Sequence, residues 1–263
     1  MVELETLLTD LAAEGEELDG TVAGLPAARW GTPTPAPGWT IAHQIAHLTW
    51  TDELALRSAR DPAGFTAELG RTGGDIQGFI DAGAAEGPTT APADLLARWR
   101  ASRTALAAAL REVPMGVRLP WVGTRMSPAS MATGRLMETW AHGQDVLDAL
   151  GLAREPSGRL HHVARIGVRA RDYAFTAHGL PVPDGEFRVE LSAPDGQVWD
   201  FGPPDAPQRV TGPALDWCLL VTQRRHPDDT TLVAVGDDAR AWLTVAQAFA
   251  GPPGAGRKAG QHR

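Results

Sequence analysis

The residues best suited to chemistry lie in the middle of the chain, where a carboxylate, an imidazole and a second carboxylate occur close together in the sequence. Glu138 and His142 are four residues apart, and Asp145 follows three residues later. If this segment is an α-helix, these intervals place all three side chains on one face. A carboxylate and an imidazole one turn apart can bind the same cation, as in the metal sites of helical bundles. The spacing therefore predicts a metal-binding face, on which Asp145 is a candidate catalytic residue.

A third ligand must come from another segment, and His47 is the natural candidate if its helix faces the first one. Two imidazole nitrogens and one carboxylate oxygen suit zinc or a related divalent transition metal better than magnesium or calcium. His43 is a rival ligand four residues before His47, but a fourth protein ligand would tend to close the site to substrate. We therefore expect His43 to lie behind the ligands or in the core. An exposed Glu138–His142 pair is the alternative, and apolar neighbours argue against it: Met137, Trp140, Val146 and Leu147.

Four helical segments in residues 1–152 could position these side chains. Apolar residues recur at helical spacing, and Pro92 and Ser127-Pro128 stand where helices begin. The expected helices cover residues 1–18, 40–60, 92–113 and 128–150. We expect the first to stop at Asp19-Gly20 and residues 73–87 to form a glycine-rich connection. Four helices, two pairs of which are joined by longer crossover connections, predict a four-helix bundle.

The helix expected over residues 40–60 is apolar on both sides. Ile41, Ile45 and Leu48 share one side, and the opposite side combines imidazoles with large apolar groups: His43, His47, Trp50 and Leu54. Such a helix is buried on both faces. Trp50 lies close to His47 on the second face and is a candidate cofactor-binding residue.

Residues 153–251 change character and predict a small α+β domain. Residues 187–191 alternate in polarity, Asp195-Gly196 forms a turn, and residues 197–201 return as a hairpin. Helices are expected at 161–178, 213–225 and 238–250, with a strand at 231–235. Residues 252–263 are rich in glycine, proline and charge and are expected to be a disordered tail. The predicted fold class is thus α+β, mostly α.

Composition limits the function classes. The 263 residues carry 32 acidic and 24 basic side chains, a net charge of −8, without a basic run, so nucleic acid is an unfavourable partner. The single cysteine, Cys218, excludes a disulfide within the chain and fits a reducing cytoplasm. We expect Cys218 to be a small core residue. The sequence has neither a signal-peptide pattern nor a membrane-spanning stretch, so a cytoplasmic protein without membrane contact is expected.

The sequence resembles the mycothiol-dependent maleylpyruvate isomerase family, within the wider DinB-like group of four-helix metalloproteins. The resemblance rests on three motifs: Gly38-Trp39-Thr40-Ile41, Ala46-His47-Leu48, and Glu138 with His142 and Asp145. It covers about the first 150 residues. The C-terminal segments at residues 216–226 and 246–251 are similar to an actinobacterial branch of the family.

The resemblance implies a metal-holding bundle followed by a domain similar to sterol-carrier folds. It further implies that the metal binds the thiolate of mycothiol, which attacks an electrophilic substrate. In the isomerase the thiolate adds to a conjugated alkene and leaves after rotation, whereas in sister enzymes it stays on the product. The C-terminal motif departs from the isomerase, so the substrate itself does not carry over.

Arg224 and Arg225 are candidate catalytic residues, and Arg224 is also a candidate cofactor-binding residue. Isomerase relatives keep an arginine near this position for a carboxylate, while basic residues also favour helix ends for electrostatic reasons alone. The leading hypothesis is a metal enzyme that uses a low-molecular-weight thiol as isomerase or S-transferase. The alternatives are a thiol-independent Lewis-acid enzyme acting on a carbonyl-bearing metabolite and a non-catalytic small-ligand binding protein. The expected partners are a small-molecule substrate and the thiol, and the sequence leaves a homodimer open.

Overall fold

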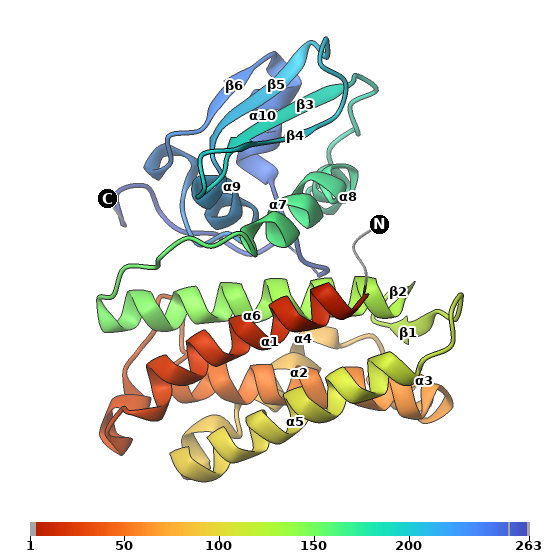
Figure 1. Cartoon of the computed structure of the whole chain (residues 1–263), viewed down its shortest axis with the longest axis vertical. Helices are drawn as coiled ribbons and strands as arrows, with labels where there is room; N and C mark the ends of the chain where they lie inside the picture. Colours follow the sequence, from red (N-terminus) through yellow and green to blue (C-terminus); the bar gives the residue numbers. More distant parts are fainter. Residues whose placement is uncertain (1–3, 252, 262–263) are drawn as a thin grey trace. The chain divides into compact units, whose positions relative to one another are not determined.

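The computed structural model describes residues 4–251 and 253–261. The chain divides into two compact units, residues 1–154 and residues 155–263. The first unit is helical apart from one small hairpin, and the second carries a four-stranded sheet with helices (Figure 1). The predicted fold class, α+β and mostly α, is confirmed.

Four long helices form the bundle of the first unit. They are α1 (Leu4–Ala23), α2 (Ile41–Arg60), α5 (Pro92–Glu112) and α6 (Pro128–Leu150). Helix α2 packs against α5 and α6, and α1 packs against α6 and α5 (Figure 1). Their shared core contains the fully buried side chains of Ile41, Ile45, Leu48 and Trp99. The predicted four-helix bundle is therefore present, with α2 at its centre.

Helix α1 does not stop at Asp19-Gly20, as the sequence predicts, but continues to Ala23. The Asp19 carboxylate accepts two hydrogen bonds of 2.6 Å from the Arg100 guanidinium of α5. Leu18 and Val22, on either side, are buried in the core. Tertiary contacts thus hold in helical form two residues that favour turns in isolation.

Two helices that the sequence does not predict lie between α2 and α5. Helix α3 covers Pro62–Arg71, before the glycine-rich connection expected at residues 73–87, and α4 covers Ile76–Ala84, within it. Each begins with an aspartate whose carboxylate accepts a backbone N–H three residues later, Asp61 from Gly64 and Asp75 from Gly78, both at 2.9 Å. A short hairpin, β1 (Leu119–Trp121) and β2 (Thr124–Met126), precedes α6. Helix α4 matters for function because it packs across α2.

The second unit is built on a mixed sheet. Its strands are β3 (Phe187–Ser192), β4 (Val198–Phe201), β5 (Gln208–Pro213) and β6 (Val233–Val235), in the order β4-β3-β5-β6. The predicted hairpin of β3 and β4 is confirmed. Strand β5 was not predicted, because its sequence is polar and ends in Gly-Pro, and it owes its form to pairing with β3 and β6.

The helices of the second unit are shorter than the sequence suggests. They are α7 (Leu160–Arg169), α8 (Arg171–Ala177), α9 (Ala214–Val221) and α10 (Asp237–Val245). Trp217 of α9 and Trp242 of α10 meet edge to face at 4.9 Å, and Cys218 is fully buried beside them, as expected. Residues 253–261 are irregular, and the Gly260 N–H donates to the Asp229 carboxylate at 2.8 Å. The tail predicted at 252–263 also includes residues 252, 262 and 263, which lie outside the described residues.

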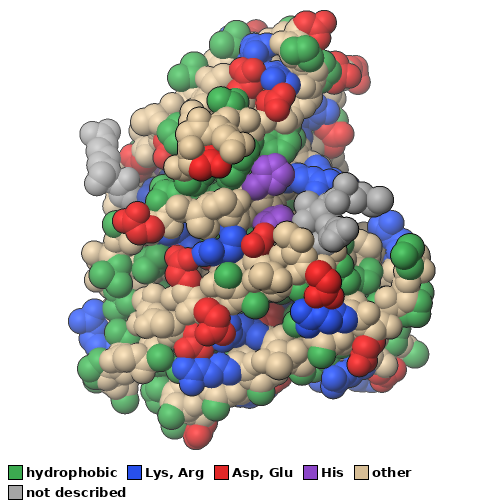
Figure 2. All heavy atoms as spheres, viewed as in Figure 1, with side chains coloured by type: hydrophobic (Ala, Val, Ile, Leu, Met, Phe, Trp, Pro, Cys, Tyr) green, Lys and Arg blue, Asp and Glu red, His purple; other side chains and the backbone are tan. Residues whose placement is uncertain are grey.

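Acidic and basic side chains are mixed on the surface of the protein. Figure 2 shows acidic and basic side chains interspersed on the face in view. Ion pairs account for part of this pattern, as where Arg98 bonds Glu53 at 2.6 Å and Glu86 at 2.7 Å. Among the described residues, no helix is both long and apolar enough to cross a membrane.

Candidate metal centre

The structure brings His47 of α2 together with Glu138 and His142 of α6. One potential ligand atom from each of the three residues lies within 4.8 Å of the other two. Glu138 Oε2 is 3.1 Å from His142 Nε2 and 3.7 Å from His47 Nε2, and the two imidazole rings are 4.5 Å apart between centroids. Two helices distant in sequence thus supply two nitrogens and one oxygen to one point. This donor set fits zinc or a related divalent transition metal.

The beginning of α2 explains how the histidines are placed. Thr40 is the N-cap, and its N–H donates to His43 Nδ1 at 3.1 Å while its hydroxyl lies 2.9 Å from the same atom. His43 thus closes a capping box in which its imidazole takes the part that glutamate usually plays. His43 is therefore engaged with the helix start, and His47 lies one turn further on.

A hydrogen-bonded chain links His142 to the loop before α2. His142 Nδ1 is 2.5 Å from Gln44 Oε1, Gln44 Nε2 donates to Thr34 Oγ1 at 2.9 Å, and Thr34 Oγ1 donates to the Trp39 carbonyl at 3.0 Å. Gln44 is fully buried. By contrast, His47 Nδ1 is buried and finds no hydrogen-bond partner among the described residues. The two histidines therefore differ in how their orientation is fixed.

Electrostatics favour a charged carboxylate at this point. Burial opposes ionisation of Glu138, but its hydrogen bonds with His142 and His47 and the charge of Arg135 outweigh burial and hold the pKa of Glu138 well below its usual range. The Glu138 side chain is 25% exposed, so the ligand atoms remain accessible from outside. An ionised, reachable carboxylate beside two imidazoles is what a metal site requires.

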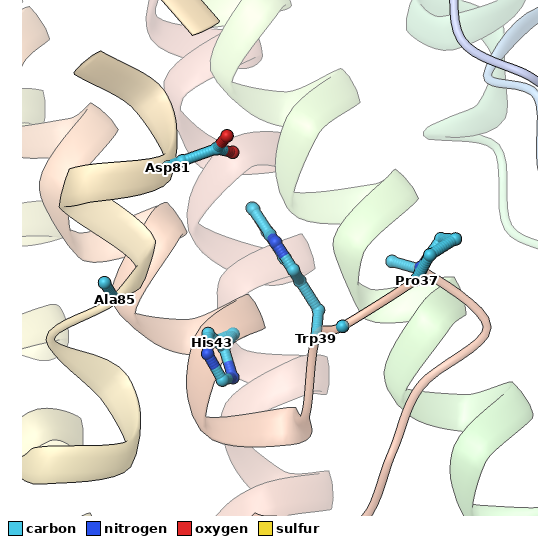
Figure 3. Close-up of a pocket in the computed structure, with 7 residues that line it drawn as sticks. Pro37, Trp39, His43, Asp81 and Ala85 are labelled. Carbon is cyan, nitrogen blue, oxygen red and sulfur yellow. The ribbon is translucent and has the colours of Figure 1, made fainter. Parts of the chain in front are cut away.

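A cavity of about 540 Å³ opens beside these residues, between the loop at residues 36–39 and helix α4. Figure 3 shows Trp39 from the loop and Asp81 from α4 reaching toward the same space. The Trp39 indole stacks on His142 with 5.9 Å between ring centroids and lies 5.3 Å from His47. Trp39 therefore both lines the cavity and contacts the two histidines. Trp39 thus connects the cavity with the candidate ligands, which are not themselves among its lining residues.

The other predicted residues of the first unit lie apart from the three ligand atoms. Trp50 is 6.3 Å from His47 between ring centroids and meets Phe79 of α4 edge to face at 4.8 Å. Its indole also lies against Gly83, where a side chain on that residue would collide with it. Asp145 is buried in α6 and is not one of the group of three. Trp50 thus holds α4 against α2, and its cofactor contact stays a prediction, as does a catalytic role for Asp145.

Arg224 and Arg225 belong to the second unit, and the helix expected to carry them ends earlier. Helix α9 stops at Val221 because Gln223 adopts a left-handed backbone with φ of 59°. The backbone N–H groups of both arginines then donate to the Leu219 carbonyl, at 2.8 and 3.2 Å. The pair thus lies in the turn after the helix and not on the helix itself.

Sequence reasoning missed the part that Trp39 and Gln44 take in this site. Trp39 precedes the helix, so helical periodicity carried no information about its position. Gln44 did leave a signal, because a polar side chain on a helix expected to be buried on both faces must have a polar partner. That partner could not be named without knowing which loop and helix surround it.

Comparisons with known proteins agree with this architecture. The family model described as the mycothiol maleylpyruvate isomerase N-terminal domain matches residues 11–147, and one described as wyosine base formation matches residues 183–235. Two uncharacterised proteins, from two strains of Mycobacterium tuberculosis, are each 55% identical over 250 residues, which is 95% of this chain and 97% of theirs.

Solved structures share the fold at low sequence identity. The crystal structure of the mycothiol-dependent maleylpyruvate isomerase has a TM-score of 0.61 at 17% identity, over 85% of this chain and 90% of that one. A histidine-to-alanine mutant of that enzyme gives 0.62 at 16% identity, over 89% and 93%. Because the first family model spans just over half of the chain, the protein belongs to the family of the mycothiol maleylpyruvate isomerase N-terminal domain.

Proposed function

We propose that this protein is a divalent-metal-dependent enzyme that activates a low-molecular-weight thiol, with mycothiol as the first candidate. The reaction would be isomerisation of an electrophilic small metabolite or S-transfer to it. The observation that carries the proposal is the convergence of His47, Glu138 and His142 beside a cavity lined by Trp39 and His43. Family membership supports the thiol, since the isomerase of similar fold is described as mycothiol-dependent.

The metal centre would be held by His47, Glu138 and His142, leaving a position open to ligand. A divalent metal bound there, zinc foremost, lowers the pKa of a bound thiol, so that thiolate is available near neutral pH. The thiolate sulfur would add to the alkene carbon of a conjugated carbonyl substrate, while the π electron pair moves onto the carbonyl oxygen as an enolate. In an isomerase, rotation about the resulting single bond and return of the electron pair would expel the thiolate. In an S-transferase, the enolate would instead take up a proton, and the thioether would stay.

His43 can assist as a hydrogen-bond donor within the cavity. Its Nδ1 accepts from the Thr40 N–H, so the neutral ring carries its proton on Nε2. Burial lowers the pKa of His43, which favours the neutral ring at neutral pH. A substrate carbonyl or carboxylate in the cavity would therefore meet a fixed, uncharged donor.

Thiol dependence separates this proposal from direct Lewis-acid catalysis. Metal-loaded protein dialysed free of thiols should be inactive toward electrophiles such as conjugated keto acids, and mycothiol should restore turnover. The measurement is product formation with and without added thiol, and metal-stripped protein is the control. Undiminished turnover without thiol would favour the thiol-independent enzyme. Metal binding without turnover of any thiol–electrophile pair would favour a binding protein.

Arg224 is proposed to bind a carboxylate of the thiol or substrate. A guanidinium can meet a carboxylate with two parallel hydrogen bonds, and losing a charge-assisted contact costs about 1.5–3 kcal/mol. Arg224→Met should therefore weaken ligand binding or turnover roughly ten- to a hundredfold, with metal content and unfolding midpoint unchanged. Arg225→Met is the matched comparison. If both variants bind ligand like the wild type, neither arginine has this role.

A further inference from the structure

Gln44 connects a candidate metal ligand to the loop that lines the cavity. It lies on α2, three residues before His47, and its fully buried amide contacts His142 on one side and Thr34 on the other. A buried amide with both ends bonded has a fixed direction. That direction determines which nitrogen of His142 carries a proton.

The donor and acceptor of each hydrogen bond in this series follow from its last member, the bond between Thr34 and Trp39. The Trp39 carbonyl can only accept, so the Thr34 hydroxyl donates to it at 3.0 Å and has no further proton to give. Thr34 Oγ1 must then accept from the Gln44 NH₂ group at 2.9 Å. This leaves the carbonyl end, Gln44 Oε1, facing His142 Nδ1 at 2.5 Å, and the proton between them belongs to His142 Nδ1.

A neutral His142 protonated on Nδ1 presents a lone pair on Nε2. That lone pair faces Glu138 Oε2 at 3.1 Å, and His47 Nε2 lies 3.7 Å from the same oxygen. Two acceptor atoms at this separation repel each other unless a proton or a metal ion lies between them, and a metal ion bound here would take the place of the proton that His142 otherwise shares with Glu138. Metal binding through His142 Nε2 requires that this nitrogen carry no proton. Gln44 favours this state, because its carbonyl oxygen holds the proton of the neutral ring on Nδ1.

The same amide is linked through Thr34 to the loop that lines the cavity. The loop before α2 closes on itself through a backbone bridge of Pro33 with Thr40 and through the Thr34 N–H, which donates to the Trp39 carbonyl at 2.8 Å. Trp39 in turn stacks on His142. The loop is thus connected to His142 directly, by the stacking of Trp39, and indirectly, through the hydrogen bonds of Thr34 with Gln44 and of Gln44 with His142.

We propose that Gln44 is a positioning residue that fixes the tautomer and ring orientation of His142 and ties this ligand to the cavity loop through Thr34. This inference rests on the proposed metal centre. Ligand-orienting partners of this kind typically change metal affinity 10- to 100-fold when mutated. The two ends of the amide make separate contributions, which separate variants can distinguish.

Gln44→Leu removes both contacts and should weaken zinc binding about 10- to 100-fold, measured by competition with a chromophoric chelator. Gln44→Glu keeps an acceptor for His142 Nδ1 and should restore most of the affinity. Thr34→Val cuts only the link to the loop and should leave zinc affinity within a few-fold of wild type. Thr49→Val is the matched control, because Thr49 is buried on the same helix and its hydroxyl bonds only to the Ile45 carbonyl among the described contacts.

Imidazole ¹⁵N shifts of histidine-labelled protein give a second readout that a loss of packing alone would not change. The His142 signal, assigned by its loss in His142→Ala, should report Nδ1–H in the wild type and in Gln44→Glu. Gln44→Leu should shift it toward the other tautomer. Wild-type zinc affinity together with an unchanged Nδ1–H signal in Gln44→Leu would overturn the inference. If no variant and no wild-type sample binds zinc, the metal centre is wrong, and the metal-free ¹⁵N spectra still decide whether Gln44 sets the tautomer.

Discussion

His142→Ala should abolish stoichiometric metal binding while leaving the bundle folded. A structural zinc site with four ligands is worth about 10–16 kcal/mol, so an equal share per ligand is about 2.5–4 kcal/mol, and the loss of one ligand weakens binding roughly 70- to 900-fold. The His142 side chain is 13% exposed, stacks on Trp39 and is not part of the apolar core cluster, so its removal should leave the core packing of the bundle intact. His47→Ala and Glu138→Gln should have effects of the same size.

Metal content after purification and zinc affinity by chelator competition measure this effect. His161→Ala is the control, because this imidazole belongs to the second unit, where it packs on Trp199 at 5.0 Å. It should retain about one metal per chain. Since imidazoles must be deprotonated to bind, zinc affinity of the wild type should also fall as the pH is lowered. Full metal in His142→Ala and in His47→Ala would show that the three residues do not form the site.

The sequence contained enough to predict the long helices and to bring the three ligand candidates together. Both follow from local rules, since a 3.6-residue period and the Ser127-Pro128 start define α6, and the four-residue interval puts Glu138 and His142 on one face. Placing His47 opposite them required only that two helices of one bundle face each other. These are the cases in which local preference and tertiary structure agree.

The errors fall where tertiary contacts override local preference. Asp19 remains helical because two arginines of α5 bond its carboxylate, and β5 exists because strands on both sides pair with it. The end of α9 depends on the left-handed backbone of Gln223, a conformation that a glutamine seldom adopts. Gln44 belongs to the same class, because its role is defined by His142, 98 residues away. No local pattern could supply these partners.

Removing the charge of Arg135 should destabilise the first unit more than any surface substitution. Arg135 of α6 donates to Asp52 of α2 at 2.8 Å, and both side chains are less than 5% exposed. They lie three and five residues from Glu138 and His47, so this pair joins the two ligand-bearing helices next to the metal centre. Breaking a buried ion pair by removing one partner costs about 3–5 kcal/mol, because the remaining charge stays buried without compensation. Arg135→Met should lower the free energy of unfolding by that amount.

The destabilisation caused by Arg135→Met should depend on pH in a way that identifies the unpaired charge of Asp52 as its cause. Burial raises the pKa of Asp52 above its usual value even though Arg135 opposes the shift, so the folded protein holds the Asp52 proton more tightly than the unfolded chain. Without Arg135, burial should raise the pKa of Asp52 further, because the opposing positive charge is gone. The destabilisation of Arg135→Met should therefore be full at neutral pH and shrink as the pH falls through the raised pKa of Asp52, because protonation removes the unpaired charge. Urea denaturation in the presence of a chelator, at neutral and mildly acidic pH, measures this without a contribution from bound metal.

The double variant Asp52→Leu with Arg135→Met separates charge from packing. Replacing a buried ion pair by apolar side chains of similar volume is often neutral or stabilising, so the double variant should recover most of the stability that Arg135→Met loses. It should also bind zinc less tightly than the wild type, because Arg135 contributes to holding Glu138 in its charged form. Equal stability of wild type and Arg135→Met at neutral pH would mean that Asp52 is not charged in the folded protein, and the pair would then contribute only a hydrogen bond from the charged guanidinium to a neutral carboxyl group.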